Sequence, residues 1–187
     1  MVGCRMSTAG QRLGKLSGHF PEAQQTQRET TVGPLKVGDS LPASRVVVCK
    51  EGERAPACVR SLFEKKKGVL FCIPGAFTPA CTSRHLPSYL EKLEDLRAKG
   101  VEVVACLSVN DPFVVEAFSR HTGVSGRLLM VSDGNADFVK AAGLSFDARK
   151  GLMGVRGRRF ALVLDNCVVK YVGFDNDAYA DAVLGAL

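Results

Sequence analysis

The chain has 187 residues, 46% of them hydrophobic and 24% charged, which is an ordinary composition for one folded domain. A globular chain of this length buries roughly 70% of its unfolded surface, so it can build a core without metal or disulfide staples. No apolar run approaches about 18 residues, which argues against a membrane span. The formal charge of +6 is spread along the chain, unlike the clustered charge of a dedicated nucleic-acid binder.

The cysteines do not form a disulfide or metal pattern. They number seven, an odd count, and no two have CxxC spacing: Cys4, Cys49, Cys58, Cys72, Cys81, Cys106 and Cys167. Several lie inside apolar runs, where a free thiol behaves as a small buried hydrophobe. The pattern indicates a reducing compartment and predicts no metal site.

The N-terminal segment differs in composition from the rest. Residues 1–31 carry few large apolar side chains and no acid before Glu22. Arg5, Arg12 and Lys15 fit a mitochondrial-type transit peptide, and a disordered tail fits equally well. We therefore expect a cytoplasmic or mitochondrial protein whose folded domain spans 32–187.

The first half of that domain alternates between strand and helix patterns. Apolar runs at 45–49 and 69–73 predict strands that are buried on both faces. After Pro87, leucines recur at helical spacing until Gly100, which predicts one helix. A strand at 101–107 follows.

The second half begins with two helices that have clear start signals. Asp111 before Pro112 predicts a capped helix that runs to about His121. After a strand at 128–131, Asp133 is predicted to cap a short helix that ends before Gly143.

The order of elements changes near the C-terminus. Strands at 160–164 and 167–172, separated only by Asp165 and Asn166, predict a hairpin, and a last helix begins at about 178. The series βαβαβα followed by ββα predicts parallel strands joined by right-handed crossovers, with an antiparallel hairpin added. The fold class is α/β, a thioredoxin-like fold with a mixed central sheet flanked by helices.

One junction between a strand and a helix is chemically distinctive. In open α/β sheets, reactive groups lie where a strand's carboxyl end meets the next helix. After the strand at 69–73 comes ProGlyAlaPheThrProAlaCys, in which Thr78 is a natural N-cap and Pro79 suits the first helical position. Cys81 then lies in the first turn, where backbone N–H groups and the helix dipole favour a thiolate. This makes Cys81 the candidate nucleophile.

Three sequence blocks resemble one enzyme family. ProGlyAlaPheThrProAlaCysThrSerArgHisLeuProSerTyr at 74–89 is similar to the active-site signature of peroxiredoxins of the type-5 (type II, alkyl-hydroperoxide-reductase-like) subfamily. AlaCysLeuSerValAsnAspProPhe at 105–113 and GlyValArgGlyArgArgPheAlaLeuVal at 154–163 agree with it. The resemblance spans about 32–187.

The resemblance implies a thiol-dependent peroxidase for hydrogen peroxide and organic hydroperoxides, serving antioxidant defence and cell redox homeostasis. Cys81 would be the peroxidatic cysteine, and Thr78 would hydrogen-bond the thiolate and the peroxide. Arg159 would supply cationic hydrogen bonds, Pro74 would shield the thiolate, and Arg156 would support the site. Charge develops on the leaving oxygen during O–O cleavage, so such donors suit the chemistry.

The same resemblance implies the partners. We expect a hydroperoxide substrate, an external thiol reductant (glutathione with glutaredoxin, or thioredoxin) and a homodimer. No cofactor, metal, nucleic acid or membrane is expected. A resolving cysteine, which would form a disulfide with the oxidised Cys81, is missing from 175–187. Cys106 matches a cysteine proposed for that role in other members, but its apolar strand favours a core thiol.

Two other functions are open on the residues alone. His85 follows Cys81 by four residues, so a Cys–His hydrolase dyad is the enzymatic alternative. Lys65, Lys66 and Lys67 together with the arginines at 156–159 suggest an RNA-binding surface. However, the chain has no Trp and only three Tyr to stack bases.

Overall fold

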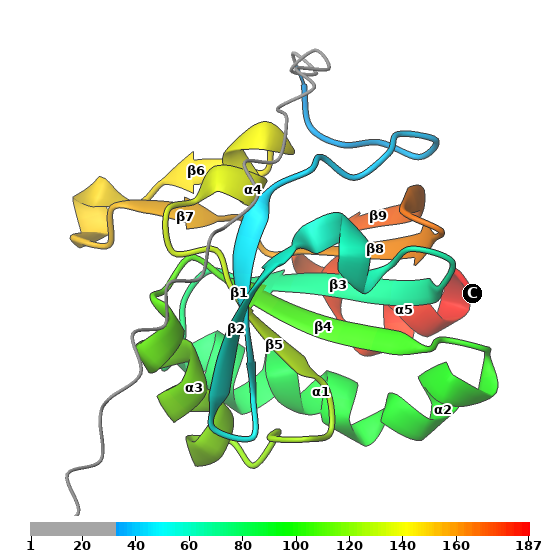
Figure 1. The fold of residues 1–187 in the computed structure, drawn as a ribbon, viewed down its shortest axis with the longest axis horizontal. Helices are drawn as coiled ribbons and strands as arrows, with labels where there is room; N and C mark the ends of the chain where they lie inside the picture. Colours follow the sequence, from blue (N-terminus) through cyan, green and yellow to red (C-terminus); the bar gives the residue numbers. More distant parts are fainter. Residues whose placement is uncertain (1–32) are drawn as a thin grey trace, which may run out of the picture.

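The structure is a computed structural model that describes residues 33–187 (Figure 1). The interpretation of residues 1–31 as a tail or transit peptide, and the position of Cys4, lie outside the described residues. Among the residues described, no helix is long and apolar enough to cross a membrane.

A seven-stranded mixed sheet forms the centre of the molecule, in the order β2-β1-β5-β4-β3-β8-β9. Its strands are β1 (Arg45–Lys50), β2 (Glu53–Cys58), β3 (Lys67–Ile73), β4 (Val103–Ser108), β5 (Leu129–Ser132), β8 (Phe160–Asp165) and β9 (Val168–Phe174). Strands β3, β4 and β5 are parallel, whereas β8 and β9 are antiparallel to their neighbours. The predicted thioredoxin-like fold is confirmed.

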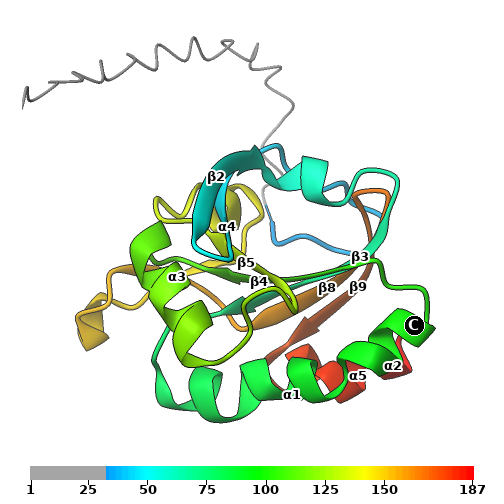
Figure 2. The same cartoon turned by 60° about the horizontal axis from the view of Figure 1, so that its bottom comes forward.

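Helices cover both faces of the sheet and enclose a core on each. They are α1 (Leu86–Glu91), α2 (Leu93–Ala98), α3 (Pro112–His121), α4 (Asp137–Ala141) and α5 (Ala180–Gly185). Figure 2 shows α1, α2 and α5 together beneath the sheet, with α4 on the other side. Side chains of α1, α2, α3 and α5 share one core cluster, and those of α4 belong to the second.

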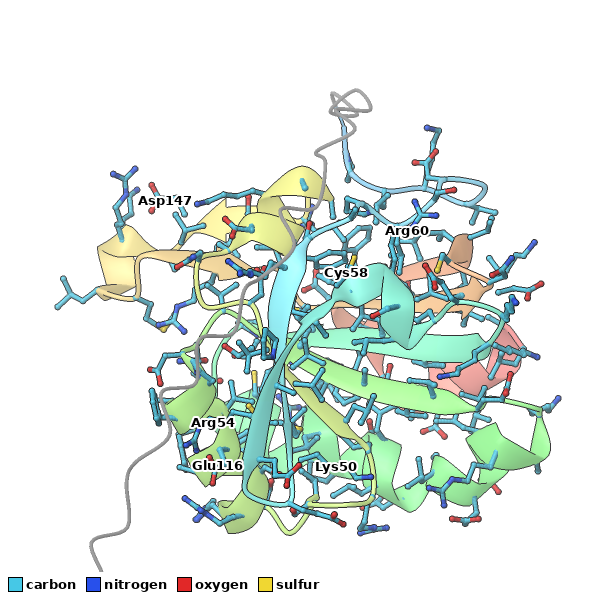
Figure 3. The ribbon with its side chains drawn as sticks, in the orientation of Figure 1. Lys50, Arg54, Cys58, Arg60, Glu116 and Asp147 are labelled. Atoms are coloured by element: carbon cyan, nitrogen blue, oxygen red, sulfur yellow. The ribbon has the colours of Figure 1, made fainter. Side chains whose placement is uncertain are left out.

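The first strand departs from the predicted parallel arrangement. β1 is antiparallel to β5, and it forms a hairpin with β2, which the sequence analysis did not predict. β2 lies at the sheet edge and is mostly exposed, so it lacks the apolar pattern of a buried strand, and it contains Pro56. Arg54 anchors this edge to α3 through an ion pair with the buried Glu116 (Figure 3).

The helix predicted after Pro87 is divided. Residues 79 and 80 are already helical, the stretch Cys81–His85 is a π-helical turn, and Lys92 separates α1 from α2. The predicted cap at Asp111 is confirmed, because its carboxylate accepts from the N–H groups of Phe113 and Val114. The N-cap residue of α4 is Ala136 rather than the predicted Asp133, although the Asp133 carboxylate still accepts from two N–H groups of the first turn.

Smaller differences lie near the C-terminus. The hairpin turn consists of Asn166 and Cys167, one residue later than predicted. A separate two-stranded sheet, β6 (Ser145–Asp147) with β7 (Val155–Gly157), was not predicted because each strand has only three residues. The last helix begins at Ala180 after the 3₁₀ turn η4 (Asp175–Ala178). In Figure 1 the β6–β7 arm projects from the body of the fold.

Candidate active site

Cys81 lies beyond the carboxyl end of β3, as predicted, after the loop at 74–78. It opens the π-helical turn, in which its carbonyl accepts from the N–H of Leu86 five residues on. π-Helical turns occur often at functional sites. The side chain belongs to the core cluster beneath the sheet and is only 1% exposed. The thiol is thus sheltered from bulk water.

Arg159 is the cationic group that touches this sulfur. The residue comes directly before β8, and β8 pairs with β3 so that Phe160 lies opposite Cys72. One terminal nitrogen, Nη2, donates to Cys81 Sγ at 3.7 Å. The other, Nη1, is buried and has no hydrogen-bond partner. The guanidinium therefore contacts the sulfur and keeps one donor unused beside it.

Thr78 and Pro74 belong to the loop that precedes Cys81. The carbonyl of Thr78 accepts the first helical bond, from Thr82 N at 3.0 Å, so Thr78 occupies the N-cap position. Its hydroxyl, however, donates to Gly75 O at 2.9 Å and accepts no N–H from the helix. Because the hydroxyl proton of Thr78 is used in this bond, the hydroxyl oxygen is left to accept a hydrogen bond. Pro74 is half-buried at the start of the loop.

Two residues that the sequence analysis did not assign to the site hold the loop in place. Asn110 follows β4, and its side-chain oxygen accepts from Ala76 N at 3.0 Å and from Ser108 Oγ at 2.5 Å. Phe77 has a positive φ of 61°, which is strained for a bulky residue. Its ring packs edge-on against Phe118 of α3 at 5.1 Å. The Asn110–Ala76 hydrogen bond and the Phe77–Phe118 contact each join segments distant in sequence, so no local sequence pattern indicates them.

Arg156 lies next to the same loop. No hydrogen bond among residues 33–187 joins it to the Cys81 sulfur. Nη1 of Arg156 donates to Val109 O at 3.0 Å, and its Nε donates to Met153 O at 2.7 Å. A Cβ on Gly75 would meet Arg156 Nη1 at 3.4 Å, so the guanidinium lies close beneath the loop. The supporting role of Arg156 stays a prediction.

The His85 side chain is buried in the core and hydrogen-bonded there. Its Nε2 lies 2.9 Å from Ala178 O, a carbonyl that requires this nitrogen to donate, and Nδ1 is buried without a partner. The ring contacts Phe71, Tyr89 and Tyr179. Burial lowers the pKa of His85 to about 4, so the ring is neutral near pH 7. None of its hydrogen bonds reaches Cys81, and the hydrolase dyad finds no support.

Cys106 and Cys72 lie behind the site on opposite faces of the sheet. Cys106 shares the core cluster of Cys81, whereas Cys72 belongs to the other cluster, and both are fully buried. Burial raises the pKa of Cys106 well above its ordinary value, and the neighbouring Cys81 raises it further. Cys106 lies in the middle of β4, which is paired on both sides. This is the setting of a core thiol.

The other candidate features are accounted for by the fold. Lys65, Lys66 and Lys67 surround the turn before β3, where Lys65 N donates to Asn166 Oδ1 and Lys67 Nζ donates to Lys99 O. Within residues 33–187, no group of three or more His, Cys, Asp or Glu side chains is placed to hold a metal ion.

Comparison with known proteins places this site in a family. The Redoxin family model matches residues 36–184. Peroxiredoxin-2B of Arabidopsis thaliana is 38% identical over 162 residues, which cover 83% of this chain and 100% of that protein. The chloroplastic Peroxiredoxin-2E of the same plant is 41% identical over 146 residues, which cover 75% of this chain and 62% of that protein.

Two solved structures are also similar. Reduced Prx3 of Vibrio vulnificus in complex with H₂O₂ is 36% identical, with a TM-score of 0.77 over 81% of this chain and 98% of that one. Peroxiredoxin 5 of Alvinella pompejana is 31% identical, with a TM-score of 0.75 over 82% of this chain and 97% of that one.

A thioredoxin-like sheet with a sheltered thiol at a strand end and an arginine on its sulfur defines a thiol-based redox enzyme. The chain belongs to the peroxiredoxins of the Redoxin family. It is a thiol-dependent peroxidase that acts on peroxides with the help of thiol reductants.

Proposed function

We propose that Cys81 is the peroxidatic cysteine of a type-5 peroxiredoxin, with Arg159, Thr78 and Pro74 forming its peroxide site. The observation that carries the proposal is the position of the Arg159 guanidinium. Nη2 donates to Cys81 Sγ, while the buried Nη1 is left without a partner. A peroxide oxygen beside the sulfur would supply the missing acceptor.

The chemical step follows from this geometry. The Cys81 thiolate attacks the terminal oxygen of the hydroperoxide, an S–O bond forms and the O–O bond breaks. The leaving alkoxide or hydroxide takes up a proton to become an alcohol or water, and the sulfur becomes a sulfenic acid. Arg159 stabilises the thiolate through Nη2 and the developing charge on oxygen through Nη1.

Thr78 and Pro74 complete the proposed pocket. The Thr78 hydroxyl donates to Gly75 O, so its oxygen is available to accept the hydrogen of a bound peroxide. This fixes which peroxide atom faces the sulfur. Pro74, half-buried and without a backbone N–H, limits water around the thiolate without adding a competing donor.

An external thiol would then return the sulfenic acid to the thiol. The fully buried Cys106 and the lack of Cys in 175–187 favour glutathione with glutaredoxin, or thioredoxin, as the reductant. A homodimer is proposed from the subfamily resemblance. The segment before residue 32 fits either a transit peptide, which would make the protein mitochondrial, or a disordered tail of a cytoplasmic protein. The similar Peroxiredoxin-2E is described as chloroplastic.

The test is thiol-dependent consumption of hydrogen peroxide by the reduced protein. Cys81→Ser should abolish turnover and leave the far-ultraviolet circular dichroism spectrum unchanged, since only one atom differs. Cys49→Ser, which changes a buried thiol of β1, is the matched control and should retain activity. Turnover by Cys81→Ser would disprove the assignment of the nucleophile.

A further inference from the structure

Cys58 and Cys167 are two further cysteines, and Cys167 lies at the opposite end of β3 from Cys81. Cys167 is in the β8–β9 turn, beside Asp165, which pairs with Lys67 at the first residue of β3. Cys81 follows the last residue of β3. Seven residues of strand at about 3.3 Å each put roughly 20 Å between the two ends. Cys167 is therefore too far from Cys81 to belong to the peroxide site.

The backbone at Cys167 is unusual. Cys167 has φ 66° and Asn166 has φ 46°, the left-handed pair of a two-residue hairpin turn in which the second position favours glycine. Despite this, Cys167 is only 2% exposed, and its Sγ donates to Arg60 O at 3.2 Å. The strained turn thus holds a thiol against the 3₁₀ turn η1 (Val59–Leu62).

Cys58 lies at the start of the same turn. It is the N-cap residue of η1, it is exposed, and it precedes Arg60 by two residues, which span at most about 7 Å of chain. Figure 3 labels Cys58 and Arg60, which are the N-cap residue and the second residue of this 3₁₀ turn. Cys58 is exposed to solvent, whereas Cys167 is buried against the Arg60 carbonyl of the same turn.

The electrostatics tie the two thiols together. Burial is the largest effect and raises the pKa of Cys167, and negative charge on Glu64 and Cys58 raises it further. The Arg60 guanidinium opposes this by stabilising the Cys167 thiolate. Cys58 is therefore close enough to influence the pKa of Cys167, and the Arg60 cation also acts on the buried Cys167 thiol.

We propose that Cys58 and Cys167 are a second redox site, which exchanges with small disulfides such as oxidised glutathione and closes to an intramolecular disulfide. The proposal is independent of the peroxidase assignment. The disulfide would join the end of β2 to the β8–β9 turn, on the opposite side of the sheet from the peroxide pocket.

The exchange balances in two steps. The Cys58 thiolate attacks one sulfur of oxidised glutathione, the S–S bond breaks, and one glutathione thiolate leaves. The Cys167 thiolate, beside Arg60, then attacks the Cys58 sulfur and releases the second glutathione. The protein loses two protons and two electrons, which leave with two molecules of reduced glutathione.

The experiment uses the full chain with Cys81→Ser, so that the peroxidatic thiol takes no part. The folded protein is incubated with oxidised glutathione, and non-reducing peptide mass spectrometry follows the products. A Cys58–Cys167 disulfide, with a mass loss of about 2 Da, is expected. Because Gly readily adopts φ 66°, Cys167→Gly should fold, and it should stop at a stable glutathione adduct on Cys58, heavier by about 305 Da.

Two results would overturn the proposal. One is an adduct on Cys58 that persists equally with and without Cys167. The other is a protein that stays unmodified while its Cys58 reacts freely with a maleimide. Cys49→Ser serves as the matched control and should form the disulfide as fast as the parent. Activity of the Cys81 enzyme is measured separately, so failure of either proposal is distinguishable from failure of the other.

Discussion

Replacing Arg159 with Gln removes the guanidinium from the Cys81 sulfur and keeps a polar side chain. Unit charges at the observed 3.7 Å attract by about 4 kcal/mol at an effective dielectric constant of 20, an upper figure for a half-exposed arginine. Losing one donor to charge that develops in a transition state costs about 3–4 kcal/mol. The same guanidinium supplies both the attraction to the thiolate and the donor to the transition state, so the two energies are not additive. We expect oxidation by hydrogen peroxide to slow about 100- to 1000-fold.

The assay must suit a chain without tryptophan. Reduced protein is mixed with hydrogen peroxide, quenched with acid at short times, and analysed by intact mass for the second-order rate constant. Arg158→Gln is the matched control, because Arg158 is exposed and stacks on Phe174 at 4.6 Å. It should react at the wild-type rate.

Two further variants sharpen the test. Arg159→Lys keeps the charge but offers a single nitrogen, so its rate should lie between those of wild type and Arg159→Gln. Arg156→Gln should slow oxidation less than Arg159→Gln, because Arg156 contacts backbone carbonyls. A rate for Arg159→Gln within threefold of wild type, or a larger loss in Arg156→Gln, would refute the assignment of the arginine.

Four other outcomes are expected. The pKa of His85 is about 4 in the folded protein against 6.5 for a free side chain, so the unfolded chain binds the proton first as pH falls. The folded protein keeps its full free energy of unfolding above pH 6.5, and this free energy should drop by about 3 kcal/mol toward pH 4. Urea unfolding of His85→Gln should lack this drop. Equal pH profiles for the variant and the wild type would contradict the prediction. This variant should also keep most of the peroxidase activity. Gly157→Ala places a methyl group 2.5 Å from Cys72 Sγ and should lower the free energy of unfolding by about 1–3 kcal/mol. In a double-mutant cycle, Cys72→Ala should relieve this loss. Additive effects of the two substitutions would contradict the contact. Cys106→Ala should leave glutathione- or thioredoxin-supported turnover within about threefold, and its loss would assign Cys106 a role in resolution.

The nucleophile could be predicted because its signals are local. Thr78, Pro79 and Cys81 stand within four residues, and their order alone places a thiol at a helix start after a buried strand. The arginine could not be selected this way, since Arg156, Arg158 and Arg159 all precede the same strand. The family resemblance selected Arg159. The antiparallel pairing of β8 with β3 then places its guanidinium within hydrogen-bond distance of the Cys81 sulfur.

The parts of the fold that escaped prediction depend on contacts between distant segments. β2 is exposed and contains Pro56, so its pairing with β1 leaves no apolar pattern. The direction of β1 is set by its pairing with β5, about 80 residues later, as sheet register is a tertiary property. Asn110 and Phe77 lie within the matching blocks, but their contacts join distant segments, so their support of the site was not predicted for the same reason. The π-helical turn at Cys81 likewise leaves no signal in the capping residues or in the spacing of apolar residues.

The most direct measurement of the central claim is the product of one turnover. Reduced wild-type protein is treated with one equivalent of hydrogen peroxide, trapped at once, and mapped by non-reducing peptide mass spectrometry. The account predicts a sulfenic acid on Cys81, which becomes a Cys81–glutathione disulfide when glutathione is added. A Cys81–Cys106 disulfide formed at the rate of turnover would contradict the external-thiol step, and oxidation elsewhere with Cys81 still reduced would contradict the nucleophile itself.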